Sequence, residues 1–224
     1  MSDQIEQWVT ELLRLQDEEE RMTDKQMKIV QAAVEIFAEK GYSATSTSEI
    51  AQKAGVAEGT IFRHYKTKKD LLLSIVAPIM AQLVGPFVLR DFQKVLHLEY
   101  DRYEQFLRAM LINRLEFAKR YAPILKIMVL EIPFHPELRT QFREHVASKV
   151  IERAECIVTH FQQQGQIIDM PSLSVLRMSG SVLIGYVVTR HFLAPDVDWD
   201  DETEIDRMIQ FIMHGVAPHP EATV

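Results

Sequence analysis

The sequence predicts an all-α protein with a small three-helix unit near its N-terminus and a larger helical part behind it. Apolar residues recur at intervals of three and four along most of the 224 residues, the period of a helix with one buried face. No segment shows the strict alternation of apolar and polar residues that is typical of a half-buried strand. Ser or Thr followed three residues later by Glu or Gln, the capping-box spacing, also marks helix starts.

Composition and charge limit the classes of protein that this chain can be. The hydrophobic content of 47% is enough for a buried core, and the net charge of −7 argues against a nucleic-acid partner for the chain as a whole. The charge is uneven, because residues 21–75 carry nine basic and six acidic side chains. Attraction to phosphates depends on the local surface, so this segment is compatible with a nucleic acid.

Sorting signals, disulfide bonds and membrane spans are not expected. The N-terminus lacks the basic start and continuous apolar core of a secretory signal, and Cys156 is the single cysteine. No apolar run approaches the roughly 20 residues of a membrane-spanning helix. We expect a cytoplasmic protein without a membrane partner.

Residues 1–20 predict a leader helix and an acidic linker. Two roles are open for this segment: it docks on the main body of the chain, or it is an arm that clasps a partner subunit. The apolar stripe that predicts the helix consists of Ile5, Trp8, Val9, Leu12 and Leu13.

Residues 21–70 predict three helices. Thr23 with Gln26 and Ser46 with Glu49 have the capping-box spacing, so each pair begins a helix. Gly55 then forms a tight corner before the next helix, which is the layout of a helix-turn-helix. The predicted core positions of the motif are Ile50, Ala51, Ala54, Ile61 and Tyr65.

The outer face of the second helix of this motif predicts DNA binding. If Ile61 and Tyr65 face inward, Thr60, Phe62, Arg63 and His64 are left outside. A phenylalanine ring can lie against sugars or a thymine methyl group, and arginine can reach guanine or phosphate. At the first turn of the next helix, Lys68 and Lys69 predict a phosphate clamp.

These residues closely resemble the DNA-binding domain of TetR-family transcriptional regulators, from about Thr23 to Leu73. The run GYSATSTSEIAQKAGVAEGTIFRHYKTKKDLL carries the family's Gly-Tyr, Ile-Ala, Ala-Gly-Val, Gly-Thr and paired aromatic positions. The resemblance implies a double-stranded DNA operator as partner and no enzymatic activity. It implies DNA contacts at Thr45, Ser46, Thr60, Phe62, His64 and Lys68, to which the face argument adds Arg63.

Three positions depart from the family pattern. Phe62 stands where a tyrosine hydroxyl usually bonds a phosphate, and Ser48 stands where the family often has Arg. Ala57 replaces a frequent Ser, so the recognition helix is expected to lack a side-chain cap, at a cost of about 1 kcal/mol. The recognition helix is therefore expected to depend more on apolar contact than on phosphate anchoring.

Residues 71–224 predict a larger, entirely helical domain for ligand binding and dimerisation. We expect helices near 99–120, 122–132, 136–164, 172–193 and 201–214, separated mainly by prolines. The helix at 172–193 is apolar around nearly its whole circumference and is expected to be buried on all sides. The resemblance implies that the last two helices form a homodimer interface; an ordinary monomeric core helix is the alternative.

The resemblance also implies a small-molecule effector within this domain. Methionines, aromatics and a few arginines among apolar neighbours are candidate pocket residues. No cofactor is expected. The acidic group Asp198, Asp200, Asp201 and Glu202 lies at the start of the last predicted helix, where the helix dipole favours negative charge. A metal site is the less favoured alternative, because no His or Cys lies near the group at ligand spacing. The candidate ligand residues are Met110, Arg114, Phe117, Met128, Phe134, Arg177 and Tyr186.

The sequence thus favours a dimeric repressor that an apolar or amphipathic effector releases from a palindromic operator. An activator of the same family is an open alternative, as is a helical adaptor whose basic part binds another acidic partner. An all-helical enzyme is disfavoured, because the chain has no HExxH, GxxxxGK or GxGxxG motif and no Glu-x-x-His pair.

Overall fold

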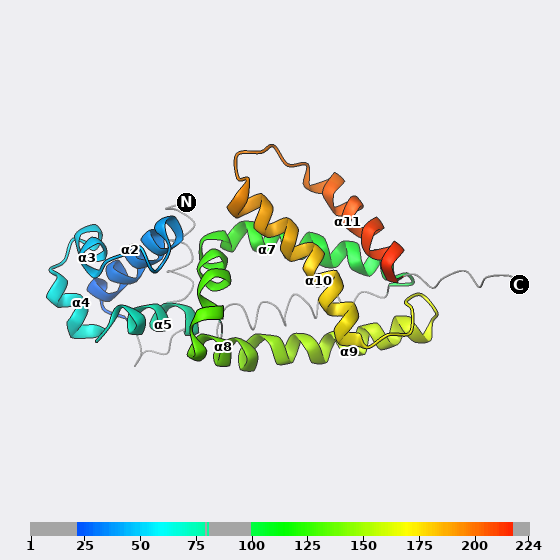
Figure 1. Cartoon of the computed structure of the whole chain (residues 1–224), viewed down its shortest axis with the longest axis horizontal. Coiled ribbons are helices and arrows are strands. Elements are labelled where there is room, and N and C mark those ends of the chain that lie inside the picture. The colour runs from blue at the N-terminus through cyan, green and yellow to red at the C-terminus, as the bar shows by residue number, and fades with distance from the viewer. Residues whose placement is uncertain (1–21, 79, 81–99, 217–224) are drawn as a thin grey trace, which may run out of the picture. The chain divides into compact units, whose positions relative to one another are not determined.

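The computed structural model describes residues 22–78, 80 and 100–216, which belong to two compact units. Unit 1 combines the N-terminal helices with residues 120–146, and the described part of unit 2 comprises residues 100–119 and 147–216. Every regular element assigned in these residues is helical (Figure 1), which confirms the predicted all-α class. The predicted leader, residues 1–20, lies outside the described residues.

The N-terminal helices of unit 1 begin where the capping residues predict. Thr23 caps α2 and Ser46 caps α3, each in a complete capping box. The Thr67 hydroxyl accepts a hydrogen bond from the Asp70 amide at 3.0 Å at the start of α5. The bounds are Asp24–Lys40 for α2, Thr47–Ala54 for α3, Glu58–His64 for α4 and Lys68–Pro78 for α5.

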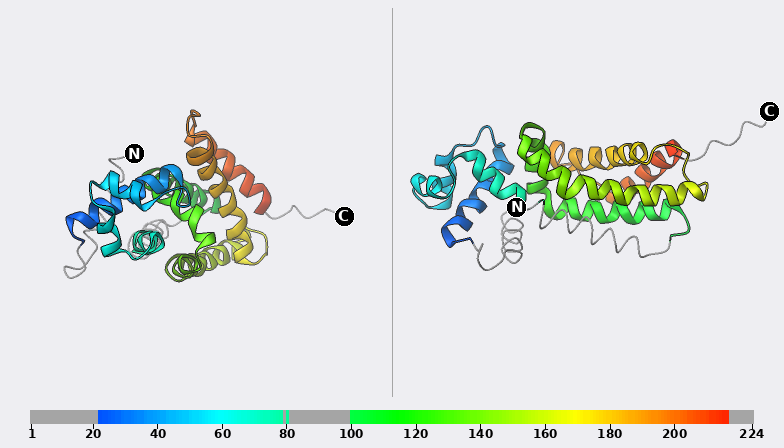
Figure 2. Two further views of the ribbon diagram at one scale, coloured as in Figure 1. Left: turned by 60° about the vertical axis from the view of Figure 1, so that its left-hand side comes forward. Right: turned by 90° about the horizontal axis from the view of Figure 1, so that it is seen from below.

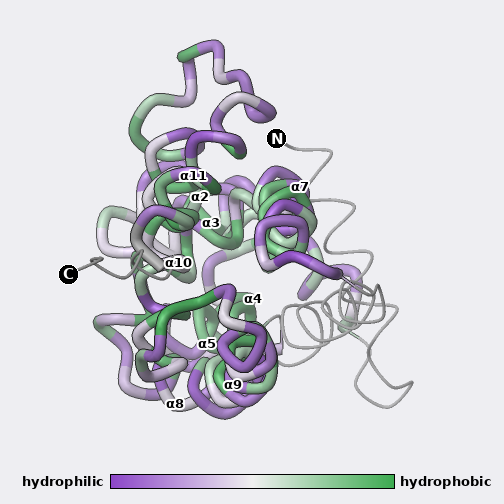
Figure 3. Tube along the Cα trace, turned by 90° about the vertical axis from the view of Figure 1, so that its right-hand side faces the viewer, coloured by the Kyte–Doolittle hydropathy of each residue, from purple (hydrophilic) through white to green (hydrophobic). Residues whose placement is uncertain are grey.

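The core of unit 1 lies where these four helices meet. Green, hydrophobic residues and purple, hydrophilic residues alternate along the chain in Figure 3, as amphipathic helices require. The apolar face of α2 packs against both α3 and α5. The fully buried side chains at this centre include Ile29, Phe37, Ile50, Ile61, Leu71, Leu72 and Ile75.

The helix α7, Tyr103–Glu131, passes from unit 2 into unit 1 and is kinked on the way. Tyr121 has the non-helical dihedrals φ −114° and ψ 19°, two residues before Pro123. Proline has no amide hydrogen and its ring clashes with the carbonyl four residues earlier, so a kink is expected. The sequence predicts two helices here, and the structure shows one helix bent at the predicted place.

The single helix predicted for residues 136–164 consists of three helical pieces. Pro136 begins α8, Pro136–Phe142, because proline is well suited to the first position of a helix. A π-helical turn, Arg143–Ala147, then leads into α9, Ser148–Gln163. The change to α9 coincides with the passage from unit 1 to unit 2.

Unit 2 is built from the first half of α7, α9, α10 and α11. The helix α10 spans Ser172–Val188 and continues as a π-helical turn, Thr189–Leu193, while α11 spans Asp201–Val216. The first half of α7, α9 and α10 run lengthwise beside one another (Figure 2), and α11 packs on α10. The core they share includes Phe106, Leu111, Phe161, Val175 and Ile209.

The apolar helix α10 is not buried on all sides, which corrects the expectation for residues 172–193. Val175 and Tyr186 are its buried residues, whereas Ile184 is 59% exposed and Leu173 and Met178 are exposed as well. Among the described residues, neighbours cover only part of the surface of α10. The stretch Ser172–Leu193, with a mean hydropathy of 1.3, is also long and apolar enough to cross a membrane. Core helices of soluble proteins meet the same criteria of length and composition.

Candidate functional site

The first helix of the motif, α3, is fixed at its N-terminus by its capping box. The Ser46 hydroxyl accepts a hydrogen bond from the Glu49 amide at 3.1 Å, and the Ser46 amide donates to the Glu49 carboxylate at 2.9 Å. Lys40 of α2 forms an ion pair with the same carboxylate at 2.8 Å. The hydrogen bonds from Lys40 and then from Ser46 lower the pKa of Glu49 to about 2. This carboxylate therefore joins α2 to the start of α3.

A tight corner at Gly55 joins α3 to α4. Gly55 has the left-handed dihedrals φ 67° and ψ 33°, which glycine adopts without a steric penalty. Ile61 of α4 and Tyr65, the C-cap of this helix, lie four residues apart on its inner side, and both are buried. Since α3 and α4 pack on each other, the inner face of α4 is fixed and its outer face is left to solvent.

The exposed side of α4 carries four of the seven predicted DNA-contact residues. Phe62 is 48% exposed, Arg63 and His64 are exposed in the last turn, and Thr60 is half-buried. This side thus offers an aromatic ring, a guanidinium, an imidazole and a hydroxyl. These groups suit the sugars, phosphates and base edges of a DNA major groove.

The helix α4 begins at Ala57 without a side-chain cap, as the departure from the family pattern predicts. A contact from α3 supports its first turn instead, because the Thr47 hydroxyl donates to the Glu58 carboxylate at 2.6 Å. That contact orients Glu58 but leaves the first amides of α4 without a side-chain acceptor at the cap position. The first turn of α4 therefore lacks the stabilisation of about 1 kcal/mol that a side-chain cap provides.

Thr45 and Ser46 have structural partners within unit 1. Thr45 is buried, and its hydroxyl donates to the Gly41 carbonyl at 2.7 Å. Ser46 is exposed, with its hydroxyl and amide both engaged in the cap of α3. DNA contacts by these two residues remain predictions, and for Thr45 the buried hydroxyl is not the group that DNA would reach.

Lys68 holds the motif together from within. Its Nζ donates to the Tyr42 carbonyl at 2.8 Å and to the Thr45 carbonyl at 2.6 Å, and lies 4.4 Å from the centroid of the Tyr42 ring. These contacts join the start of α5 to the segment before α3. The sequence predicts a phosphate contact for this ammonium group, but the structure places two of its hydrogen bonds inside the chain, because free carbonyls of the turn lie within its reach.

Lys69 also has a partner in the chain, Glu137 at the start of α8, at an Nζ–Oε1 distance of 2.7 Å. Hydrogen bonding from Lys69 lowers the pKa of Glu137. Nearby, the His135 ring meets the Tyr42 ring edge-on, with centroids 5.2 Å apart, and its Nε2 lies 3.3 Å from the Glu131 carboxylate. Nothing in the sequence signals this contact, since 68 residues separate Lys69 from Glu137.

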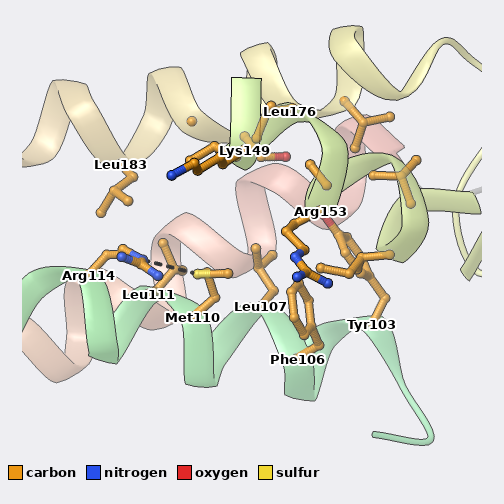
Figure 4. Close-up of a pocket in the computed structure, with 17 residues that line it drawn as sticks. Tyr103, Phe106, Leu107, Met110, Leu111, Arg114, Lys149, Arg153, Leu176 and Leu183 are labelled. Atoms are coloured by element: carbon orange, nitrogen blue, oxygen red, sulfur yellow. Dashed lines mark hydrogen bonds between the residues drawn. The ribbon is translucent and has the colours of Figure 1, made fainter. Parts of the chain in front are cut away.

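Unit 2 contains a cavity of about 250 Å³ between the first half of α7, α9 and α10 (Figure 4). Two of the seven predicted ligand residues, Met110 and Arg114, line it, with Arg114 Nε 3.4 Å from the Met110 sulfur. Most of the wall is apolar, as is usual for small-molecule sites. Its apolar residues include Phe106, Leu107, Leu111, Ile157, Leu176 and Leu183.

The polar groups of the cavity include two basic residues whose position in a pocket has no signal in the sequence. Lys149 and Arg153 lie one turn apart on α9 and both line the cavity, across from Arg114 on α7. Among the described lining residues there is no Asp or Glu. Ser179 of α10 lies beside the hydroxyl of Tyr103, whose pKa is raised by burial. An apolar wall with basic groups and no described acid suits an amphipathic anion.

The other five predicted ligand residues do not line this cavity. Methionine and aromatic side chains predict a pocket only through their type, and the same types fill ordinary cores. Arg177 is exposed on α10, and Phe134, which belongs to unit 1, is 79% exposed. The remaining three are buried but do not line the cavity: Phe117, Met128 and Tyr186.

The acidic group before α11 has structural partners. Asp200 accepts hydrogen bonds from the Thr203 amide and hydroxyl and so caps α11, which lowers the pKa of Asp200. Asp201 accepts a hydrogen bond from Tyr186 at 2.7 Å and forms an ion pair with Arg190 at 2.6 Å. Burial, followed by the bond to Asp201, raises the pKa of Tyr186 to about 12. In the part of the chain that the structure describes, no cluster of His, Cys, Asp and Glu is placed to hold a metal ion.

Comparison with known proteins connects the helix-turn-helix to one family. Residues 29–75 match the model of the bacterial regulatory proteins of the tetR family. The Fatty acid metabolism regulator protein of Bacillus subtilis is 47% identical over 60 residues, which cover 27% of this chain and 31% of that protein. A transcriptional repressor of Mycobacterium tuberculosis is 31% identical over 85 residues, 38% of this chain and 45% of that protein. These sequence matches span less than half of the relatives' length.

Solved structures extend the likeness to the whole fold. The transcriptional regulator FadR from Bacillus subtilis, in complex with stearoyl-CoA, has a TM-score of 0.62 and 25% identity, covering 84% of this chain and 98% of that one. FadR from Bacillus halodurans, at 22% identity, shares the fold with a TM-score of 0.64, over 88% of this chain and 98% of that one. The relatives named here are regulators rather than enzymes. With its match over residues 29–75 and its all-helical fold, the chain is similar to the TetR family of transcriptional regulators.

Proposed function

We propose that this protein is a ligand-responsive transcriptional regulator that reads double-stranded DNA with α4. The exposed side of α4 carries the proposal, because Phe62 and Arg63 project from a helix whose inner residue Ile61 is fully buried. A solvated helix gains little from an exposed phenylalanine, whereas a DNA groove offers the ring sugars and methyl groups. The tetR-family match over residues 29–75 supports the same assignment.

Phosphate contacts come from lysines that the chain leaves exposed. Lys25 and Lys28 lie in the first two turns of α2, and Lys66 lies between α4 and α5; all three are exposed. Lys68 and Lys69 are engaged within unit 1 and contribute less than the sequence predicts. Such phosphate contacts supply most of the non-specific affinity and position the recognition helix.

The active form is a homodimer joined through α10 and α11. Ile184 of α10 and Phe211 of α11 are 59% and 71% exposed, and Leu173 and Met178 extend the apolar surface along α10. Burying such a surface against its copy removes apolar area from water and makes α10 a core helix of the dimer. Two reading units per dimer match a palindromic operator with half-sites about 34 Å apart.

The effector enters the cavity of unit 2 and releases the protein, a repressor, from its operator. An apolar wall with Lys149 and Arg153 at its polar part fits an amphipathic molecule. The likeness to a Bacillus subtilis fatty acid metabolism regulator, and to a structure holding stearoyl-CoA, supports a fatty acyl compound. Lowering operator affinity requires a coupling free energy of only about 1–3 kcal/mol. We propose that the protein acts in the cytoplasm.

An electrophoretic mobility shift assay tests the DNA assignment. The full-length protein should shift duplexes of its own promoter region at low salt, and Thr60→Ala/Arg63→Ala should weaken that shift at least about tenfold, since one good base contact is worth about 1–3 kcal/mol. Arg139→Ala/Thr140→Ala removes the same groups from exposed positions of α8 and should bind normally. An undiminished shift for Thr60→Ala/Arg63→Ala would contradict the assignment of α4 as the DNA-recognition helix.

The same assay separates the alternatives. A helical adaptor would show no affinity for any duplex but salt-dependent binding to an acidic protein. An activator would bind the duplex equally well and raise transcription from it in a purified transcription assay, where a repressor lowers it.

A further inference from the structure

We propose that Glu58 determines part of the DNA sequence specificity, because its carboxylate accepts a hydrogen bond from the amino group of a cytosine in each operator half-site. This role rests on the proposed reading of DNA by α4, and it specifies one base pair of the operator. Three features support it, namely the exposure of Glu58, its position beside Phe62 and the contact from Thr47.

Glu58 lies on the same side of α4 as the exposed ring of Phe62. The two residues are four positions apart, which makes their side chains neighbours on the surface of a helix. Both are exposed, while Ile61 on the inner face is fully buried. One helical turn of about 5.4 Å corresponds to one or two base-pair steps of about 3.4 Å. With the Phe62 ring in the major groove, the carboxylate of Glu58 therefore faces a base pair close to the one that the ring contacts.

Thr47, the first residue of α3, holds this carboxylate in position. Its hydroxyl donates to Glu58 Oε1 at 2.6 Å, and Thr47 itself is half-buried. Within the described part of the chain, no other side chain forms a hydrogen bond or an ion pair with Glu58, so Oε2 is available to a partner. A side chain that is fixed before binding loses less conformational entropy when the complex forms. The contact therefore prepares the carboxylate for a hydrogen bond to a base.

The chemistry of a carboxylate decides which base it prefers. An ionised carboxylate accepts hydrogen bonds and donates none. In the major groove, guanine presents two acceptors and thymine an acceptor beside its methyl group, so both disfavour a carboxylate. Adenine presents an amino donor next to the acceptor N7, whereas cytosine presents its amino donor alone. Cytosine is therefore the expected partner of Glu58, and the other three bases are discriminated against by acceptors that face the charge.

Gly59 leaves room for a base edge beside Glu58. A glycine inside a helix is destabilising relative to alanine. A Cβ added to Gly59 would meet no atom of the described chain within 4 Å, so packing within that part of the protein does not require a glycine. The lack of a side chain at this exposed position instead allows base edges to approach the backbone of α4 closely.

Selection of duplexes from a random pool, with the full-length protein and with Glu58→Gln, tests the base assignment. The parent protein should enrich a cytosine at one position of each half-site. Glu58→Gln should change the preferred base at that position to adenine, because glutamine pairs with adenine N6 and N7, and should leave the other positions unchanged. Thr47 can still donate to the amide oxygen of the variant, so its side chain stays in place. Identical enriched sites for the two proteins would contradict the role of Glu58.

Affinity measurements separate base reading from a structural role of Glu58. The parent protein should bind the selected duplex about tenfold more tightly than a duplex in which that C·G pair is replaced by T·A, and Glu58→Ala should reduce this ratio to below about twofold. Glu58→Ala should bind an unrelated duplex at least as tightly as the parent, since it lacks a charge that repels phosphates. Glu155→Ala, at an exposed position of α9, is the matched control and should retain the full ratio. Weaker binding of Glu58→Ala to both duplexes at an unchanged ratio would mean that Glu58 is only structural.

Thr47 is a positioning residue for this contact. Thr47→Val removes the hydroxyl and should reduce the same ratio by about threefold or more, whereas Thr47→Ser retains the donor and should preserve the ratio. An undiminished ratio in Thr47→Val would overturn the positioning role. The two levels of the account fail separately. If the parent protein binds no duplex, the DNA-reading function fails; if it enriches a palindrome in which neither Glu58 variant alters a base preference, only the role of Glu58 fails.

Discussion

Replacing Lys68 with methionine separates the two roles that this residue could have. In the structure its ammonium group donates to the Tyr42 and Thr45 carbonyls and lies over the Tyr42 ring. Methionine retains most of the apolar stem but removes all three polar contacts. If Lys68 is mainly structural, Lys68→Met should destabilise unit 1 even in the absence of DNA.

The magnitude follows from the contacts that are lost. Hydrogen bonds to charged groups contribute about 1.5–3 kcal/mol each at best, and a cation–π contact about 0.5–1 kcal/mol at exposed sites. Lys68 is only half-buried, so water replaces part of this interaction. We therefore expect the free energy of unfolding to fall by about 2 kcal/mol in total, less than the roughly 3.5 kcal/mol to which the lowest of these contributions add up.

Urea denaturation followed by circular dichroism measures the loss, and hydrogen exchange locates it. Amides around Thr45, which lie next to the two carbonyl acceptors, should exchange faster in Lys68→Met. Lys66→Met, an exposed lysine two residues earlier, serves as control and should change neither measurement. Unchanged stability together with lost DNA affinity in Lys68→Met would refute the structural role and restore the phosphate contact that the sequence predicts.

Three further changes test other parts of unit 1. Ala57→Ser supplies the missing cap of α4 and should raise the free energy of unfolding by about 0.5–1 kcal/mol, measured by urea denaturation; no gain would mean that α4 is already capped in solution. Glu137→Gln releases Lys69 from its ion pair. The slope of the logarithm of the DNA-binding constant against the logarithm of the salt concentration should then steepen by about 0.9 for each DNA-binding unit that gains a phosphate contact. An unchanged slope would place Lys69 away from DNA. Because the pKa of Glu49 is lowered to about 2 in the folded protein, below its ordinary 4.5, its stabilising effect is complete above pH 4.5 and is lost as the pH falls towards 2. Glu49→Gln should therefore flatten the pH dependence of stability in that window, and a titration identical to the parent protein would contradict the pairing with Lys40.

The sequence predicts well what local rules decide. Capping pairs such as Ser46 with Glu49 locate the helix starts, and the four-residue spacing of Ile61 and Tyr65 decides which side of α4 is buried. The missing cap at Ala57 follows from residue type at a known position. All of these features involve residues only a few positions apart.

Contacts between distant segments are beyond such rules. Lys68 and Lys69 look like free cations in the sequence, yet one bonds to carbonyls more than 20 residues earlier and the other to Glu137. The cavity shows the same limit, since Met110 and Arg114 line it but Phe134 and Tyr186 do not. Residue type can suggest that a side chain belongs to a pocket. Whether that side chain faces the cavity depends on how α7, α9 and α10 pack.

The exposed apolar side of α10 has a different explanation. Its sequence predicts a helix buried on all sides, and the single chain buries only part of it, with Ile184 left 59% exposed. Within the proposed dimer, the prediction describes the assembled molecule rather than the isolated subunit. Hydrophobicity predicts that a surface is buried, but it does not distinguish a partner in the same chain from one in a second copy.

Selection of bound duplexes from a random pool tests the central claim most directly, because the recovered sequences report DNA binding, dimer symmetry and half-site spacing together. We predict one enriched palindrome with half-sites about one helical turn apart, near 34 Å. Enrichment should disappear with the Thr60→Ala/Arg63→Ala variant. A pool that stays random, or an enriched site that the variant still selects, would contradict a regulator that reads DNA with α4.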